Sequence, residues 1–144
     1  MNKSLPDKWI RKAIYTAINN IVVDGETIPC YDSRVTSDTI PQHYVLMTTQ
    51  TNDVSKENKC EHFWESDILL DIITSYDSTG NTGSRLLADN ILDEVRRLTD
   101  SLTLDVASGL NIIFNTQSFP NDISTITPNE SVFRKFIRIQ LKIR

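Results

Sequence analysis

The chain has 144 residues, of which 39% are hydrophobic and 24% charged, with only four glycines and five prolines. Such a chain can bury one globular core, so we expect a single domain over residues 1–144. The formal net charge is −4, from 19 acidic and 15 basic side chains. A general nucleic-acid-binding protein usually carries a basic excess, so the composition argues against that class.

The first eight residues contain no apolar run after their lysines, and nowhere does the sequence contain eighteen consecutive apolar residues. We therefore expect neither a signal peptide nor a membrane span. In a chain that is not exported, Cys30 and Cys60 would stay reduced, and we interpret both as structural thiols.

The first predicted element is an amphipathic helix that begins near Asp7. Its apolar residues recur at intervals of three and four, which places them on one face of a helix. They are Ile10, Ala13, Ile14, Ala17, Ile18 and Ile21. Residues 22–28 are rich in β-branched side chains around Asp24-Gly25, a dipeptide that tolerates the positive φ angles of a tight turn, and they predict a small hairpin.

Residues 44–50 have the composition of a strand, and the turn-forming sequence Thr51-Asn52-Asp53 follows them. The polar segment 52–58 lacks apolar anchors, so we expect an exposed hairpin tip. Its candidate partner-binding residues are Asn52, Asp53, Lys56 and Glu57. We hypothesise that this tip orders against a neighbouring component in an assembly.

The segment 64–76 alternates between apolar and polar residues, which predicts a strand with one buried face. The positions that face away from the core carry Glu65, Asp67 and Asp71, which we call the acidic row. A row of carboxylates on a strand is most often a solvated surface. Here it is also a candidate for an interface.

A second amphipathic helix is predicted over residues 86–98, with apolar residues again at helical spacing. They are Leu87, Ala88, Ile91, Leu92, Val95 and Leu98. The preceding turn, 77–84, contains several residues that favour the start of a helix. It lacks the spacing and the lysine of a phosphate-binding loop, so a helix cap is the better interpretation.

Residues 110–114 and 131–144 are predicted strands, and a polar, proline-containing loop over 120–128 separates them. The outward positions of the last strand carry Arg134, Arg138 and Lys142, which we call the basic row. Three interpretations of the basic row remain open. It is a solvated face, a salt-bridged partner of the acidic row, or a contact for nucleic acid.

Together these elements predict an α+β fold, in which an antiparallel sheet has two helices packed on one face, plus a small β-hairpin. The parities of the strands and the stripes of the helices place nine apolar residues in one core. They are Ile14, Ile18, Leu70, Ile72, Leu87, Ile91, Val95, Ile137 and Ile139.

No arrangement of residues in the sequence indicates catalysis. His43 and His62 are the natural bases near neutral pH, and neither lies in a recognised nucleophile motif. The single Cys60-Glu61-His62 pattern lacks the paired spacings of a structural zinc site. We expect no catalytic residues, metal or cofactor, and we predict that the protein is not an enzyme.

The helix Trp9 to Ile18, followed by Ile28-Pro29-Cys30-Tyr31-Asp32, resembles the opening of the phage tail completion or tail terminator family. Further on, Tyr44-Val45-Leu46, the polar hairpin, the strand through Asp71-Ile72 and the helix 86–98 are similar to that family in order and spacing. The long loop 120–128 departs from the family pattern. The resemblance covers most of the chain and consists of hydrophobic patterns.

This resemblance implies a homo-oligomeric ring in the phage neck or at the head-proximal end of the tail. The ring would join neighbouring neck, connector and tail proteins and let genomic double-stranded DNA pass, with the acidic row Glu65, Asp67 and Asp71 as a candidate lining of its channel. The protein would be assembled in the bacterial host cytoplasm and reside in the virion, without a membrane. The alternative function is a small monomeric module that binds an anion or nucleic acid, using the turn 80–84 or the basic row.

Overall fold

A computed structural model describes residues 5–55, 62–77 and 83–144. The elements in chain order are helix α1 (Asp7–Ile18), strands β1 (Ile21–Val23), β2 (Glu26–Ile28), β3 (Cys30–Asp32), β4 (His43–Ser55) and β5 (Phe63–Asp77), helix α2 (Leu86–Thr99), a 3₁₀ turn η1 (Val106–Ser108), and strands β6 (Ile112–Ser118), β7 (Ile123–Ile126) and β8 (Glu130–Ile143).

Six strands form one sheet in the order β3-β4-β5-β8-β6, and β7 pairs with β8 beside β6. All pairs are antiparallel except β3 with β4, which are parallel. The prediction of an antiparallel sheet was therefore incomplete, because the sheet is mixed. The loop 33–42 returns the chain to the end of the sheet where β3 began. Cys30 therefore lies opposite Val45, and the two strands run in the same direction.

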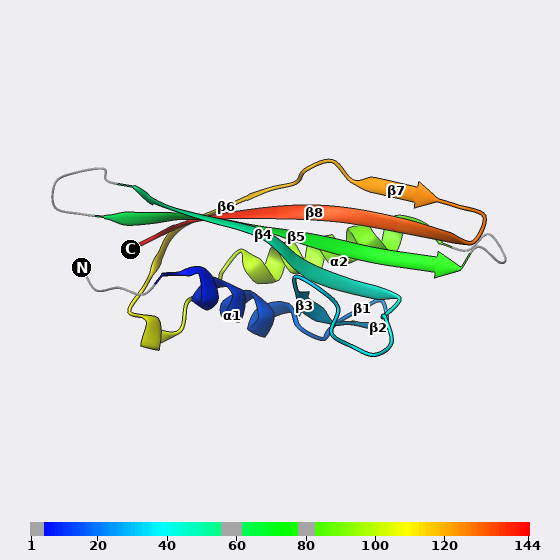
Figure 1. Cartoon of the computed structure of the whole chain (residues 1–144), viewed down its shortest axis with the longest axis horizontal. Coiled ribbons are helices and arrows are strands. Elements are labelled where there is room, and N and C mark those ends of the chain that lie inside the picture. Colours follow the sequence, from blue (N-terminus) through cyan, green and yellow to red (C-terminus); the bar gives the residue numbers. More distant parts are fainter. Residues whose placement is uncertain (1–4, 56–61, 78–82) are drawn as a thin grey trace.

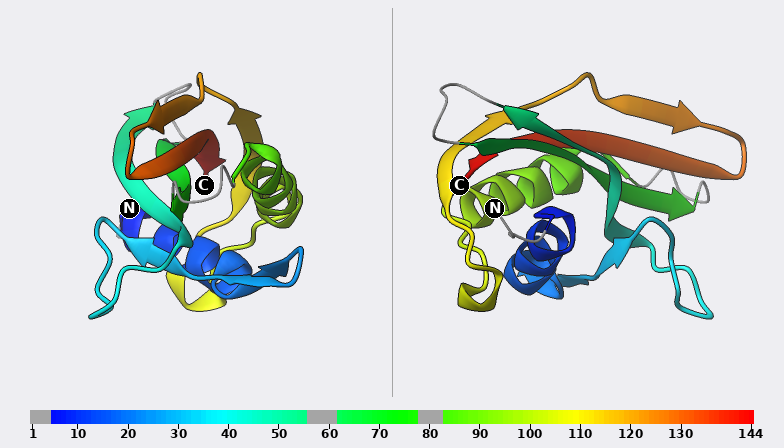
Figure 2. Two further views of the ribbon diagram at one scale, coloured as in Figure 1. Left: turned by 90° about the vertical axis from the view of Figure 1, so that its right-hand side faces the viewer. Right: turned by 60° about the vertical axis from the view of Figure 1, so that its left-hand side comes forward.

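Both helices pack on the same face of the sheet, as Figures 1 and 2 show. This agrees with the prediction. The core lies between the helices and the sheet, and it contains eight of the nine predicted residues as fully buried side chains, while Leu87 packs against its margin. We call the other face, which no helix covers, the open face.

The small hairpin is the separate two-stranded sheet β1-β2. Its turn residues Asp24 and Gly25 have φ angles of 52° and 80°, as a tight turn with two left-handed residues requires. The hairpin leads directly to β3. The side-chain oxygen of Asn19, which follows α1, accepts a hydrogen bond of 3.1 Å from the backbone N–H of Cys30, and so ties the end of the helix to β3.

Two predicted loops contain strands. Residues 52–55 continue β4 and pair with residues 63–66 of β5, so they are not the tip of a hairpin. Residues 123–126 form β7 and pair with residues 131–134 of β8. Residues 52–55 are mostly polar, and residues 123–126 are a short segment between Pro120 and Pro128. Their strand structure comes from backbone hydrogen bonds to long neighbouring strands, which local composition does not reveal.

Candidate interaction surface on the open face of the sheet

The acidic and basic rows lie on adjacent strands of the open face. The acidic row is on β5 and the basic row on β8, and the two strands are antiparallel neighbours. Their register places Glu65 opposite Lys142, and it brings Asp71 beside Arg134. The two rows that are separate in the sequence thus form one mixed surface in the folded chain.

The strongest contact on this surface joins Asp71 and Arg134. Arg134 Nη2 lies 2.5 Å from Asp71 Oδ2, and Arg134 Nε donates to both carboxylate oxygens at 3.2 and 3.3 Å. Asp71 is only 2% exposed. The hydrogen bonds that Arg134 donates to Asp71 raise the pKa of Arg134. A carboxylate buried to this degree requires such a charge-assisted partner, so the pair is a structural element of the face.

Apolar and aromatic side chains flank this ion pair. The guanidinium of Arg134 lies 5.3 Å from the centre of the Phe136 ring, and Phe136 is the cross-strand neighbour of Asp71 on β8. On the other side, Leu46 of β4 lies opposite Asp71. Burial, followed by the charge of Asp71, raises the pKa of the neighbouring Tyr44. Asp71 itself is therefore shielded from water, while Arg134 keeps 39% of its side chain exposed.

The contacts are weaker toward the other end of the rows. Arg138 Nε lies 3.5 Å from Asp67 Oδ1, with exposed side-chain fractions of 45% and 29%. Gln140 donates a long hydrogen bond of 3.4 Å to Asp67. The ammonium of Lys142 lies 4.7 Å from the centre of the Phe63 ring. Of the three interpretations of the basic row, pairing with the acidic row within the subunit is observed for Arg134 and Arg138.

This end of the open face is hollowed. An open depression of about 360 Å³ is lined by residues of β4, β5, β6 and β8. They are Thr51, Asp53, Glu65, Ser66, Asp67, Phe114, Thr116, Gln140, Leu141 and Lys142. Asp53 and Glu65 are directly opposite each other across β4 and β5, an arrangement of like charges that costs stability. The depression is thus the most acidic part of the surface.

Two of the four candidate partner-binding residues lie in a strand. Asn52 and Asp53 belong to β4, and the Asn52 side chain accepts a hydrogen bond of 2.7 Å from the Ser66 hydroxyl. Lys56 and Glu57 lie outside the described residues. The part of the hypothesis that concerns residues 52–55 as a loop is wrong, because β5 pairs with them throughout.

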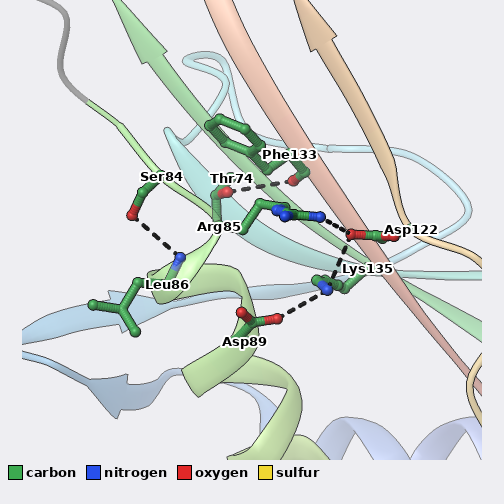
Figure 3. Close-up of polar contacts among 8 residues, drawn as sticks. All are labelled: Thr74, Ser84, Arg85, Leu86, Asp89, Asp122, Phe133 and Lys135. Atoms are coloured by element: carbon green, nitrogen blue, oxygen red, sulfur yellow. Dashed lines mark hydrogen bonds and ion pairs between the residues drawn. The ribbon is translucent and has the colours of Figure 1, made fainter.

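A second polar cluster was not found from the sequence (Figure 3). Lys135 of β8 faces the helices, and its ammonium lies 2.9 Å from Asp89 of α2 and 3.1 Å from Asp122. Arg85, at the start of α2, also contacts Asp122 at 3.1 Å. The hydrogen bond with Asp89 is the main cause of the raised pKa of Lys135. The signal in the sequence was a lysine among the buried positions Phe133, Ile137 and Ile139.

The cluster fixes the segment before β7. Asp122 immediately precedes that strand, and its two cationic partners come from β8 and α2 (Figure 3). Hydrogen bonds from Lys135 and then Arg85 lower the pKa of Asp122. At the start of α2, the Ser84 hydroxyl accepts a hydrogen bond of 3.2 Å from the Leu86 N–H, as expected of a helix cap. Residues 80–82 of the predicted turn lie outside the described part of the chain.

Two of the residues considered for catalysis or metal binding, His43 and Cys30, are buried in the fold. His43 is buried and packs against Tyr76 with ring centres 5.2 Å apart, and burial lowers its pKa. Cys30 is buried, which raises its thiol pKa to about 12. Cys60 is outside the described residues. Within residues 5–55, 62–77 and 83–144, no three His, Cys, Asp or Glu side chains gather as a metal site would require.

Among the residues that the structure describes, no helix is long and apolar enough to cross a membrane. No family model matches the sequence, and no curated protein matches it significantly. The fold itself has known counterparts. One solved chain, from the structure described as "Virion of native gene transfer agent (GTA) particle", matches with a TM-score of 0.61 at 13% identity. The match covers 94% of this chain and 96% of that one, so the two share their fold over almost their entire lengths.

Proposed function

We propose that the protein is a structural component of a phage-like virion. The observation that supports this most strongly is the shared fold with a chain of a gene transfer agent particle over nearly the full length of both chains. The match covers nearly all of both chains. It therefore favours a corresponding single-domain subunit over a common motif embedded in a different protein.

Within the virion, we propose that the chain forms a homo-oligomeric ring in the neck or at the head-proximal end of the tail. There it would join the tail to the head connector and let DNA pass. The resemblance to the tail completion family in the segments around Trp9, Tyr31 and Asp71 supports this position. A single domain with different surfaces on its two sides also suits head-to-tail contacts, which close into rings.

The acidic end of the open face has a natural role in such a ring. If Asp53, Glu65 and Asp67 faced the channel, their charges would repel the phosphate backbone and let DNA slide without sticking. The monomeric nucleic-acid-binding alternative has less support, because Arg134 and Arg138 of the basic row already pair with carboxylates of the same subunit.

Electron microscopy of the purified chain and of virions tests the proposal. We expect annular particles with a central opening, and gold-labelled antibodies at the junction of head and tail. A chain that stays monomeric at all concentrations and is absent from virions would overturn both the ring and the virion assignment.

Charge reversal tests the channel role separately. With Asp53 and Glu65 changed to Lys, rings should still assemble if these residues face the channel, but DNA passage should slow because the phosphates would be held. The matched control is the reversal of Glu94, an acidic residue on the helical side of the molecule. Unchanged infectivity of the Asp53/Glu65 variant would rule out the channel role.

A further inference from the structure

The sheet has two open edges at one of its ends. At the acidic end of the open face, four strands lie side by side in the order β4-β5-β8-β6. On one side, β3 pairs only with residues 45–47 of β4, so within the described chain the segment 48–55 has no strand on its outer edge. On the other side, β6 pairs with β8 alone.

The β6 edge lacks the charged side chains that commonly protect an edge strand from pairing with another strand. Natural edge strands commonly carry charges, especially lysine, yet no residue within β6 or β7 is charged. A bulge between Ile112 and Phe114 interrupts the register, and residues 114–118 beyond it run regularly along β8. Five of the twelve exposed large hydrophobic side chains of the described residues fall in or between these two strands. They are Ile113, Phe114, Phe119, Ile123 and Ile126.

Helix α2 holds β6 in place from the inner side. Asn115 donates a hydrogen bond of 2.7 Å to the Thr99 carbonyl, and Gln117 donates one of 3.1 Å to the Arg96 carbonyl. Both acceptors lie in the last turn of α2, and the Arg96 carbonyl also accepts the Asp100 N–H at 3.1 Å. The edge is therefore ordered before any partner arrives, which lowers the entropic cost of adding a strand to it.

The two open edges lie at the same level of the sheet, and their strands run in opposite directions, as antiparallel pairing between two copies requires. Thr116 of β6 lies opposite Gln140, which lies opposite Asp67, which lies opposite Thr51 of β4. The same stretch of the sheet thus ends in residues 114–117 on one side and 50–53 on the other. Because the four strands alternate in direction, β6 runs opposite to β4. A copy rotated about an axis along the strands would present its β4 antiparallel to this β6.

We propose that β6 of one subunit pairs with residues 48–55 of β4 in a second copy of this chain, so that the sheet continues from subunit to subunit. This inference rests on the proposed ring and names its contact. The two edges are different surfaces on opposite sides of one sheet, and a repeated contact between different surfaces closes into a ring when the rotation allows it. The depressions lined by Asp53, Glu65 and Asp67 would then follow one another around one wall of the ring.

Cysteine cross-linking tests the pairing directly. Thr51 and Thr116 share the open face and the same level, so each is changed to Cys in a Cys60→Ser background, with Cys30 buried. When the Thr51→Cys and Thr116→Cys variants are mixed and treated with a short thiol cross-linker, they should form covalent dimers. The double variant should form covalent oligomers of increasing size, up to the full ring. Replacing Thr116→Cys by Thr125→Cys on β7 should give none, because β7 lies at the other end of the sheet.

A second measurement follows assembly itself. Changing Phe114 and Thr116 to Lys places charges on the β6 edge and should convert rings to monomers in light scattering, with an unchanged melting temperature. The matched control is Val106→Lys, at a residue 94% exposed in η1, which should leave rings intact. The pairing is overturned, and the proposed ring remains, if the wild type forms rings, the cysteine variants do not cross-link, and the edge lysines leave the rings intact. If the wild type forms no ring, both proposals fail.

Discussion

The ion pairs at the two ends of the acidic row differ in strength, although the same alternation of apolar and polar residues places both aspartates in the sequence. Asp71 is buried and held by three hydrogen bonds from Arg134, whereas Asp67 keeps about a third of its side chain in water and lies 3.5 Å from Arg138. The cross-strand neighbours of Asp71 are Leu46 and Phe136, and those of Asp67 are Thr51 and Gln140. Apolar neighbours exclude water, so one pair supports the fold and the other stays available at the surface.

The largest expected effect lies on the opposite face of the same strand. Ile72 points into the core and is completely buried, so Ile72→Ala should cost about 2–5 kcal/mol of unfolding free energy. Ile91→Ala on α2 should cost a similar amount. Urea unfolding of each variant measures this. The matched change Ile73→Ala, at a partly exposed position of the open face, should cost less, and equal losses would contradict the assignment of the two faces.

Removal of Arg134 should have the next largest effect. Arg134→Leu leaves the Asp71 carboxylate buried without its partner, at a cost of about 3 kcal/mol by urea unfolding. The double variant Asp71→Leu/Arg134→Leu should recover much of this loss, because no unpaired charge remains. A loss below about 1 kcal/mol for the single variant would show that water reaches Asp71, and that the two ends of the row are alike.

A smaller effect should appear as a dependence on pH. Burial lowers the pKa of His43 below its ordinary value of 6.5, so the unfolded chain binds a proton before the folded one does. Stability is therefore fully present above pH 6.5 and is lost as the pH falls from there toward the lowered pKa of the folded state. The urea midpoint between pH 7.5 and 5.5 should fall more in the wild type than in His43→Phe. Equal decreases would contradict this.

The smallest effect is expected at the exposed end of the row. Arg138→Leu should change the unfolding free energy by less than about 1 kcal/mol, since both partners of this pair are solvated. Measured beside Arg134→Leu under the same conditions, it sharpens the contrast between the two ends. A loss as large as that of Arg134→Leu would show that the Asp67 contact is stronger than its geometry indicates.

Periodicity predicted most of the fold because each strongly amphipathic element has one possible orientation. Ile14, Ile91 and Ile139 lie on apolar faces that are stable only when buried, and all three are in the core. The continuation of β4 through Ser55 was missed because its residues are mostly polar, and β7 was missed because a four-residue strand between two prolines is too short to show a period. The parallel strand β3 was missed because a three-residue strand carries no periodicity from which to read direction.

By itself, the sequence determined the two helices, the small hairpin, the long strands, the inner and outer faces of β5 and β8, and the positions of the charged rows. These follow from local spacing, which acts within a few residues. Only the tertiary structure decided that Asp71 and Arg134 form one buried pair, that Lys135 joins α2 to the segment before β7, and that two sheet edges stay open at the same end. The contacts join different elements, and Asp71 and Arg134 are 63 positions apart in the sequence. Their register is set only when whole faces pack together.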